Sequence, residues 1–192
     1  MPESNPEKPR ILAQRTVATS RLFQIEELDL RFSNGEQRTF ERLASRGPGA
    51  VLIVPMLDHQ TVLLIREYAA GLDRYELSLP KGLIDPGENA EQAANRELME
   101  EVGYAARQLT PITTLSLAPG YLAHQTRIIL AQDLYPQRRE GDEPEPLQVV
   151  PWSLSKLPEL LQRDDFSEAR SVAALFLASQ HPLLNYQPES HS

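Results

Sequence analysis

Three glutamates in the middle of the chain have the type and spacing to bind a cation. Glu97, Glu100 and Glu101 are three and four residues apart, so on an α-helix they share one face. Glu101 also falls between Ala90 and Ala94 on the helical wheel, at the edge of the apolar stripe that faces the core. A carboxylate at such an edge needs a partner, and oxygen ligands suit a hard divalent cation, Mg²⁺ or Mn²⁺. The alternative is a solvated acidic helix with surface ion pairs.

The segment around these glutamates contains the signals that place them. We expect the helix to run from Asn89, a good N-cap, to Val102, with Gly103 as its C-terminal stop. A turn at residues 85–88 (DPGE) precedes the helix. Arg96 can pair with one glutamate four residues away, which leaves most of the acidic charge uncompensated.

The rest of the sequence predicts a mixed sheet around this helix. Two apolar runs, residues 50–57 and 61–67, are typical of central strands buried on both faces. We expect other strands at 16–21, 22–32, 37–43, 75–79, 108–118, 125–133 and 147–152, and closing helices at 154–162 and 167–179, the latter capped by Ser167. The predicted fold class is α/β (α+β), a mixed β-sheet sandwiched between helices. A tail and small antiparallel β-unit (1–46) precede the main domain (47–186), and a tail (187–192) follows it.

Composition excludes several classes of function. The formal net charge of −8 disfavours binding to nucleic acid or to an anionic membrane. No apolar run approaches the roughly 20 residues that span a bilayer, and the N-terminus lacks the apolar core of a signal peptide. Because the chain contains no cysteine, it has no disulfide framework, no thiolate nucleophile and no metal site built from thiolates. We therefore expect a cytoplasmic protein that binds a small molecule.

The spacing of the acidic segment resembles the Nudix box. Gly82 is followed after five residues by Glu88, and after seven more by Arg96-Glu97-Leu98-x-Glu100-Glu101-x-Gly103. One position departs from the pattern, since Tyr104 replaces the usual aliphatic residue. The resemblance implies a Nudix fold and an enzyme, a pyrophosphohydrolase that uses Mg²⁺ or Mn²⁺ to cleave a nucleoside diphosphate linked to another moiety.

Features outside the box resemble the ADP-ribose pyrophosphatase branch of that family. Pro119 lies sixteen residues after Gly103 in an Ala-Pro-Gly-Tyr turn similar to the Ser-Pro-Gly turn of the branch. The segments FSNG, LIREYA, KGLIDPGE, EEVG and AQDLYP, followed by EGDEPEP, are similar to bacterial members that act on several ADP compounds. The resemblance implies hydrolysis of ADP-X (ADP-ribose, NADH, diadenosine polyphosphates) with release of AMP.

Two departures from the branch favour a relaxed preference among ADP-X compounds. Ala69 stands where many members have an arginine, and His124 replaces a glutamate after the Pro-Gly turn. The alternatives are a Nudix pyrophosphatase for another nucleotide, such as a nucleoside diphosphate sugar, and a non-catalytic ADP-ribose sensor.

The resemblance also assigns roles in the reaction. It implies that Glu97, Glu100 and Glu101 bind metal together with the backbone carbonyl of Lys81, and that Glu88 and Arg96 form a structural pair. The general base is Glu143, in the acidic loop of residues 140–146, or alternatively Glu100. Glu145, in the same loop, is a candidate second base or metal contact.

Substrate contacts are expected from other segments. Phe23 and Arg42 resemble residues that hold the adenine and a phosphate from the neighbouring subunit of a homodimer, although Phe23 could belong to the core. Arg66 could meet a phosphate or pair with Glu67 or Asp73. The resemblance also implies that the turn with Pro119, Gly120 and Tyr121 contacts the substrate.

Overall fold

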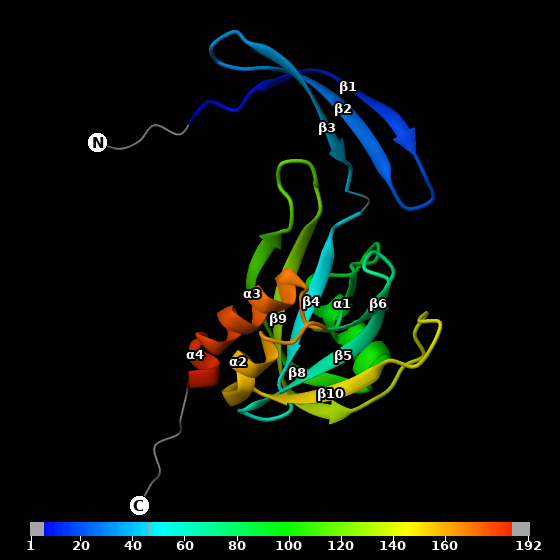
Figure 1. The fold of residues 1–192 in the computed structure, drawn as a ribbon, viewed down its shortest axis with the longest axis vertical. Helices are drawn as coiled ribbons and strands as arrows, with labels where there is room; N and C mark the ends of the chain where they lie inside the picture. Colours follow the sequence, from blue (N-terminus) through cyan, green and yellow to red (C-terminus); the bar gives the residue numbers. More distant parts are fainter. Residues whose placement is uncertain (1–5, 46, 186–192) are drawn as a thin grey trace, which may run out of the picture. The chain divides into compact units, whose positions relative to one another are not determined.

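The structure, a computed structural model, describes residues 6–45 and 47–185 and divides into two compact units (Figure 1). The first contains Met1–Arg46 and Ser116–His124, and the second contains Gly47–Leu115 and Gln125–Ser192. The expected C-terminal tail at 187–192 and the first five residues of the N-terminal tail lie outside the described residues.

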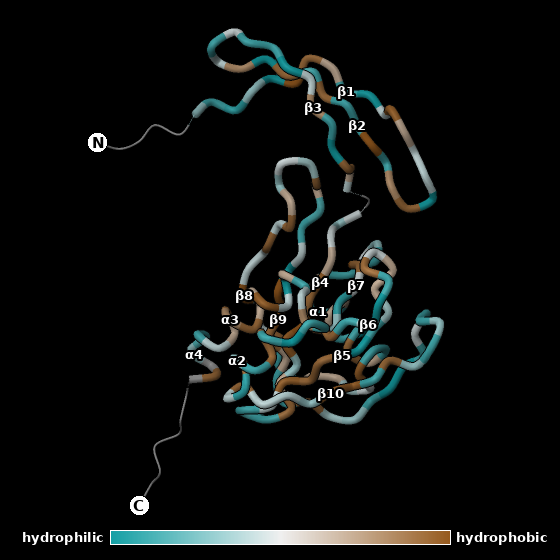
Figure 2. The backbone as a smooth tube through the Cα atoms, in the orientation of Figure 1, coloured by the Kyte–Doolittle hydropathy of each residue, from teal (hydrophilic) through white to brown (hydrophobic). Residues whose placement is uncertain are grey.

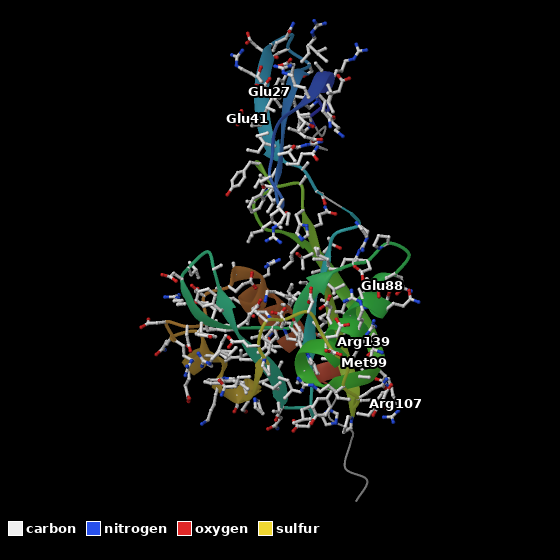
Figure 3. The ribbon with its side chains drawn as sticks, turned by 90° about the vertical axis from the view of Figure 1, so that its right-hand side faces the viewer. Glu27, Glu41, Glu88, Met99, Arg107 and Arg139 are labelled. Carbon is white, nitrogen blue, oxygen red and sulfur yellow. The ribbon has the colours of Figure 1, made fainter. Side chains whose placement is uncertain are left out.

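The first unit is a three-stranded antiparallel sheet of order β1-β2-β3, formed by Arg10–Thr19, Gln24–Arg31 and Gln37–Leu43. Its first strand begins six residues before the predicted start at residue 16. The predicted start was wrong because β2 offers pairing partners along its whole length, as far as Arg31, which lies opposite Arg10. In β2 and β3, Glu27 lies opposite Glu41, and both are labelled in Figure 3.

The segment Ser116–His124 joins the first unit through backbone hydrogen bonds to the end of β3. The Leu43 amide donates to the Tyr121 carbonyl (2.7 Å), and the Ala123 amide donates to the Leu43 carbonyl (3.1 Å). The turn with Pro119 and Gly120 therefore belongs to this unit.

The second unit contains a mixed sheet, as predicted. One sheet has the order β7-β4-β9-β8, in which β4 and β9 are parallel, and the other has the antiparallel order β10-β5-β6. A bridge between Met56 and Val62 links the two. The strands are Ala50–Pro55 (β4), Thr61–Ala69 (β5), Arg74–Ser78 (β6), Lys81–Leu83 (β7), Tyr104–Ser116 (β8), Gln125–Pro136 (β9) and Gln148–Ser153 (β10).

The helices of this unit differ from the prediction at their ends. They comprise α1 (Ala90–Glu97), a π-helix (Leu98–Val102), a 3₁₀ turn (Leu154–Lys156), α2 (Leu157–Leu160), α3 (Ala169–Ser179) and α4 (Pro182–Asn185). Glu168, not Ser167, caps α3, because its carboxylate accepts from the Ser171 amide at 2.8 Å. In the described part of the chain, no helix has the length and apolarity needed to cross a membrane.

The core alternates across the central strands, which appear brown in Figure 2. In β4, Leu52 and Val54 pack with α3 residues, whereas Val51 and Ile53 pack with residues of α1 and the π-helix. The sheet that contains β4 is thus covered by α3 on one face and by α1 and the π-helix on the other. The predicted sandwich is confirmed, and one of its two faces carries the acidic helix.

Candidate active site

The acidic helix begins at a well-formed N-cap. Asn89 accepts from the Gln92 amide (2.8 Å), and the Gln92 side chain accepts from the Asn89 amide (2.9 Å). This capping box satisfies two amides that the first helical turn leaves without partners. The turn before it needs Gly87, whose φ of 93° is costly for other residues. Cap and turn together fix where the glutamates start.

The helix does not stay α-helical to Val102, as the sequence predicted, because its last five residues form a π-helix. The Gly103 amide reaches back to the Leu98 carbonyl (3.1 Å), and Gly103 ends the helix with φ at 81°. Such wide turns are rare in proteins as a whole, and those that occur are often located at functional sites. Here the wide turn contains Glu100 and Glu101, of which Glu101 is only 5% exposed.

Arg96 is the centre of the acidic cluster. Its guanidinium donates to both oxygens of Glu88 (2.9 and 3.0 Å), which ties the preceding turn to the helix. A second edge of the same group donates to Glu97 (2.7 Å) and Glu100 (3.1 Å). Asp85 lies 3.7 Å from it as well, so one arginine faces four carboxylates, which leaves the cluster short of positive charge.

Glu97 lies directly against the backbone of β7. A Cβ atom added at Gly82 would clash with the Glu97 carboxylate, so only glycine lets the side chain occupy this place. Burial raises the pKa of Glu97 to about 7, although the bond from Arg96 acts in the opposite direction.

Glu101 is the most deeply placed acid of the cluster. Its carboxylate accepts from the Lys81 amide at 2.9 Å. Burial raises its pKa to about 8, which the nearby Lys81 charge only partly opposes. The Lys81 ammonium itself binds the Glu67 carboxylate (2.6 Å) and lies 3.3 Å from the Ser78 hydroxyl. The Lys81 side chain is therefore held by partners on β5 and β6.

The glutamates line one cavity of about 580 Å³ in the second unit. Its walls come from β7, the turn after it, the acidic helix and the acidic loop. They comprise Lys81, Gly82, Leu83, Asp85, Arg96, Glu97, Glu100, Glu101, Arg139, Glu140, Gly141, Asp142 and Glu143. The expected base Glu143 is thus brought to the box glutamates, whereas Glu145 lines a neighbouring cavity of about 420 Å³.

The donor set of this cavity fits a divalent cation. Its side-chain donors are carboxylate oxygens, the ligands that Mg²⁺ and Mn²⁺ prefer. The raised pKa values of Glu97 and Glu101 show that the fold buries acid without enough positive charge. Among residues 6–45 and 47–185, no three acidic side chains already surround a common point. Arg96 holds two of the candidate ligands, Glu97 and Glu100.

The acidic loop begins beside the π-helix. The Arg139 amide donates to the Met99 carbonyl (3.2 Å), and the Arg139 guanidinium pairs with the Glu100 carboxylate (3.2 Å). Figure 3 labels Glu88, Met99 and Arg139 on the segments that surround the cluster. Partial loss of solvent raises the pKa of Glu143, and the charge of Glu67 adds to this effect. A raised pKa is what a general base near neutral pH requires.

The expected substrate residues of the first unit lie on its surface. Phe23 is 53% exposed, so the interpretation of Phe23 as core is wrong. Arg42 is engaged by Glu26, with nitrogen to oxygen distances of 2.9 and 2.8 Å. Tyr121 is exposed at the turn that also contains Pro119 and Gly120.

Arg66 pairs with a residue that the sequence did not indicate. Its guanidinium binds Asp165 (2.8 Å), so the alternative pairing with Glu67 or Asp73 is wrong, while a contact of Arg66 with a phosphate stays a prediction. A second contact that was missed joins the Tyr75 hydroxyl to Glu145 (2.6 Å) across 70 residues. No local pattern in the sequence could have revealed either contact. For the second contact the sequence offers one general hint, which is that a tyrosine at the exposed end of a strand has a hydroxyl able to bind a partner, but this hint does not identify Glu145.

Comparisons with known proteins agree with this geometry. A family model described as the NudE-type Nudix hydrolase N-terminal domain matches residues 9–42, and the NUDIX domain matches residues 47–179. The chain is 53% identical over 174 residues to the ADP compounds hydrolase NudE of Escherichia coli (strain K12), covering 91% of this chain and 93% of the relative. It is 28% identical over 169 residues to an ADP-ribose pyrophosphatase of Bacillus subtilis (strain 168), covering 85% and 91%.

A solved structure gives the same result. A crystal structure of an ADP compounds hydrolase superposes with a TM-score of 0.85 at 53% identity, covering 91% of this chain and 94% of that chain. The NUDIX match takes in the whole acidic helix and the acidic loop. The chain therefore belongs to the Nudix family of hydrolases and is a pyrophosphohydrolase of that family.

Proposed function

We propose that this enzyme hydrolyses the pyrophosphate bond of ADP-X compounds, namely ADP-ribose, NADH and diadenosine polyphosphates, and releases AMP. The observation that carries the chemistry is the single cavity lined by Glu97, Glu100, Glu101 and Glu143. The preference for ADP compounds is supported by the 53% identity to an ADP compounds hydrolase, which extends over both units. Nudix hydrolases generally use divalent metal ions, and we propose Mg²⁺ or Mn²⁺ here.

The residues of the cavity divide the work of hydrolysis. Glu97, Glu100 and Glu101 would hold the cation, with the Lys81 carbonyl as a further ligand. There the ion would supply charge neutralisation of the pyrophosphate and a lowered pKa of a water molecule. Glu143 accepts the proton of the water that attacks phosphorus, which gives AMP and the phosphorylated second half of the substrate.

Two residues could compete with Glu143 as the base. Both oxygens of Glu100 already accept from guanidinium groups, those of Arg96 and Arg139, so a water molecule would have to compete with these bonds. Glu145 lines the other cavity and accepts from Tyr75. Within the described residues, no hydrogen bond or ion pair engages the Glu143 carboxylate, so it is available to a water molecule.

A substrate panel tests the proposal. The purified protein is incubated with Mg²⁺ and, separately, with ADP-ribose, NADH, diadenosine triphosphate and UDP-glucose, and AMP or UMP is followed by chromatography. We expect AMP from the three adenine compounds. Turnover of UDP-glucose alone would establish the sugar-nucleotide alternative, and binding without turnover would establish the sensor.

Substitution of the base tests the mechanism. Glu143→Gln keeps the size of the side chain but cannot take a proton, so we expect kcat to fall by about 10²- to 10⁴-fold. The matched control is Glu159→Gln at an exposed position of α2. Wild-type turnover by the Glu143 variant would move the base to Glu100.

We also propose a homodimer, supported by the surface of the first unit. All ten positions of β1 are exposed, and Ile11, Leu12, Val17 and Phe40 remain more than two-fifths exposed on this small sheet. A second copy of the chain would cover these side chains and bring Phe23 and Arg42 to its partner's substrate. Light scattering should give twice the chain mass of 21.6 kDa, and Leu12→Glu should shift it toward the monomer. The cytoplasmic location remains a prediction from composition.

A further inference from the structure

Residues 140–146 form a loop with few attachments of its own, although it contains the proposed base. All seven of these residues are exposed. On the upstream side, Arg139 is bound to the π-helix, and Gly141 packs so closely on Glu100 that an added Cβ would lie 3.3 Å from that side chain. Glu143 lies beyond this anchor and faces two cavities. Its position must therefore be set by something further along the loop.

That second anchor is a hydrogen bond from β6. The Tyr75 hydroxyl donates to the Glu145 carboxylate at 2.6 Å. Within the described chain it is the one hydrogen bond that residues 140–146 make, and no ion pair adds to it. Glu145 stands between Pro144 and Pro146, whose rings fix φ and limit bending of this limb. Glu143 is thus enclosed between the Gly141 contact and the Tyr75 bond.

The ring of Tyr75 is itself held in place. It lies edge-on to the ring of Tyr68, with centroids 5.6 Å apart and an interplanar angle of 68°. The two tyrosines face each other across the β5–β6 pair, and the Tyr68 hydroxyl donates to Asp73 in the connecting turn. Although Tyr75 is 48% exposed, this contact restricts its ring, so its hydroxyl loses less conformational freedom on bonding to the loop.

We infer that Tyr75 is a positioning residue for the reaction: by binding Glu145 it fastens the acidic loop and keeps Glu143 at the glutamate-lined cavity. This inference rests on the proposed role of Glu143. It also assigns Glu145 the function of a fastening point instead of that of a metal ligand or base.

Tyr75→Phe removes the hydroxyl and keeps the ring. With ADP-ribose and Mg²⁺ we expect kcat to fall about five- to tenfold, the cost of one hydrogen bond to a charged group near water, while KM changes less than about twofold. The matched control is Tyr68→Phe, which also removes one hydroxyl but keeps both the ring contact with Tyr75 and the bond from Tyr75 to Glu145. It should retain kcat within about twofold.

Two further measurements separate positioning from general damage. In a Glu143→Gln background, Tyr75→Phe should cause no additional loss of kcat, because it acts through Glu143. The double variant of Tyr75→Phe with Glu145→Ala should lose no more than either single variant. Independent losses in these pairs would overturn the inference.

A readout without turnover distinguishes failure of this inference from failure of the proposed function. Hydrogen exchange followed by mass spectrometry should show faster exchange in loop peptides of the Tyr75→Phe protein, and unchanged exchange there in the Tyr68→Phe protein. If the wild type leaves ADP-ribose intact, the proposed function fails, and with it the role assigned to Glu143, while exchange still reports the loop attachment. Unchanged exchange in the Tyr75 variant, or faster exchange with full kcat, would refute Tyr75 as a positioning residue.

Discussion

Replacing Glu101 by glutamine should stabilise the metal-free protein increasingly as pH rises from about 5 to 8, while abolishing most of its activity. Burial raises the pKa of Glu101 to about 8 from an ordinary 4.5. For an acid raised in this way, the stabilising contribution is fully present below pH 4.5 and is lost as pH rises toward 8, because the unfolded chain gives up its proton first. Glutamine has no proton to lose and can still accept from the Lys81 amide.

The size of the effect follows from the number of protons bound. Between about pH 5 and 8 the folded wild type holds one proton at Glu101 that the unfolded chain has released, so its stability falls by about 1.4 kcal/mol per pH unit from this group alone. Glu97, whose pKa is raised to about 7, titrates in both proteins and largely cancels from the difference. From pH 5.5 to 7.5 the variant should therefore gain about 3 kcal/mol over the wild type.

Urea unfolding in EDTA measures this gain. The single tryptophan, Trp152 in β10, reports on the second unit, which contains the cluster. Glu159→Gln, at an exposed position of α2, is the control and should leave the pH dependence unchanged. Millimolar Mg²⁺ should restore stability to the wild type at pH 8 and do little for the Glu101 variant. Parallel pH curves for wild type and Glu101→Gln would refute the reasoning that this carboxyl is buried without sufficient charge.

Three other substitutions test neighbouring features. Gly82→Ala places a methyl group against the Glu97 carboxylate, so kcat/KM for ADP-ribose should fall by about a hundredfold with little change in circular dichroism. Arg96→Lys keeps the charge but loses the forked donor, and should lower the free energy of unfolding in urea by about 2 kcal/mol. Ser171→Ala removes a buried hydroxyl that accepts from the Leu79 amide (3.0 Å), and should lower Tm at a cost of about 1–3 kcal/mol without changing kcat.

Each of these has an outcome that contradicts it. Full activity of Gly82→Ala would show that Glu97 can move aside and still function. Unchanged stability of Arg96→Lys would mean that the bonds of the guanidinium are replaced by solvent. A loss of kcat in Ser171→Ala would show that α3 influences the chemistry as well as the core.

Features of the active site that depend on local pattern could be predicted from the sequence. Asn89 caps its helix because its side chain needs only the amide three residues on. Glu101 was expected at the edge of the apolar stripe that contains Ala94, and it is indeed only 5% exposed. The π-helix could not be predicted, because the same residues satisfy an α-helical periodicity and only packing selects the wider turn.

Contacts between distant segments were equally inaccessible. Arg66 finds Asp165 across 99 positions of sequence, although acids much nearer in the chain were available. The cap of α3 shifted by one residue because the Glu168 carboxylate reaches the first helical amides. Which partner a side chain binds depends on its length and on how close the folded segments come to each other. The order of residues in the sequence does not contain these distances.

The division of the chain into two units also sets a limit on dissection of the protein. The polypeptide passes between the units after Arg46, after Leu115 and after His124, so the first unit is assembled from two separate stretches. Cutting the gene at residue 46 would remove three strands and leave residues 116–124 without the β3 amides and carbonyls that they bond. The two units are consequently not interchangeable modules. A chimaera that exchanges the N-terminal sheet with that of a relative must exchange residues 116–124 along with it.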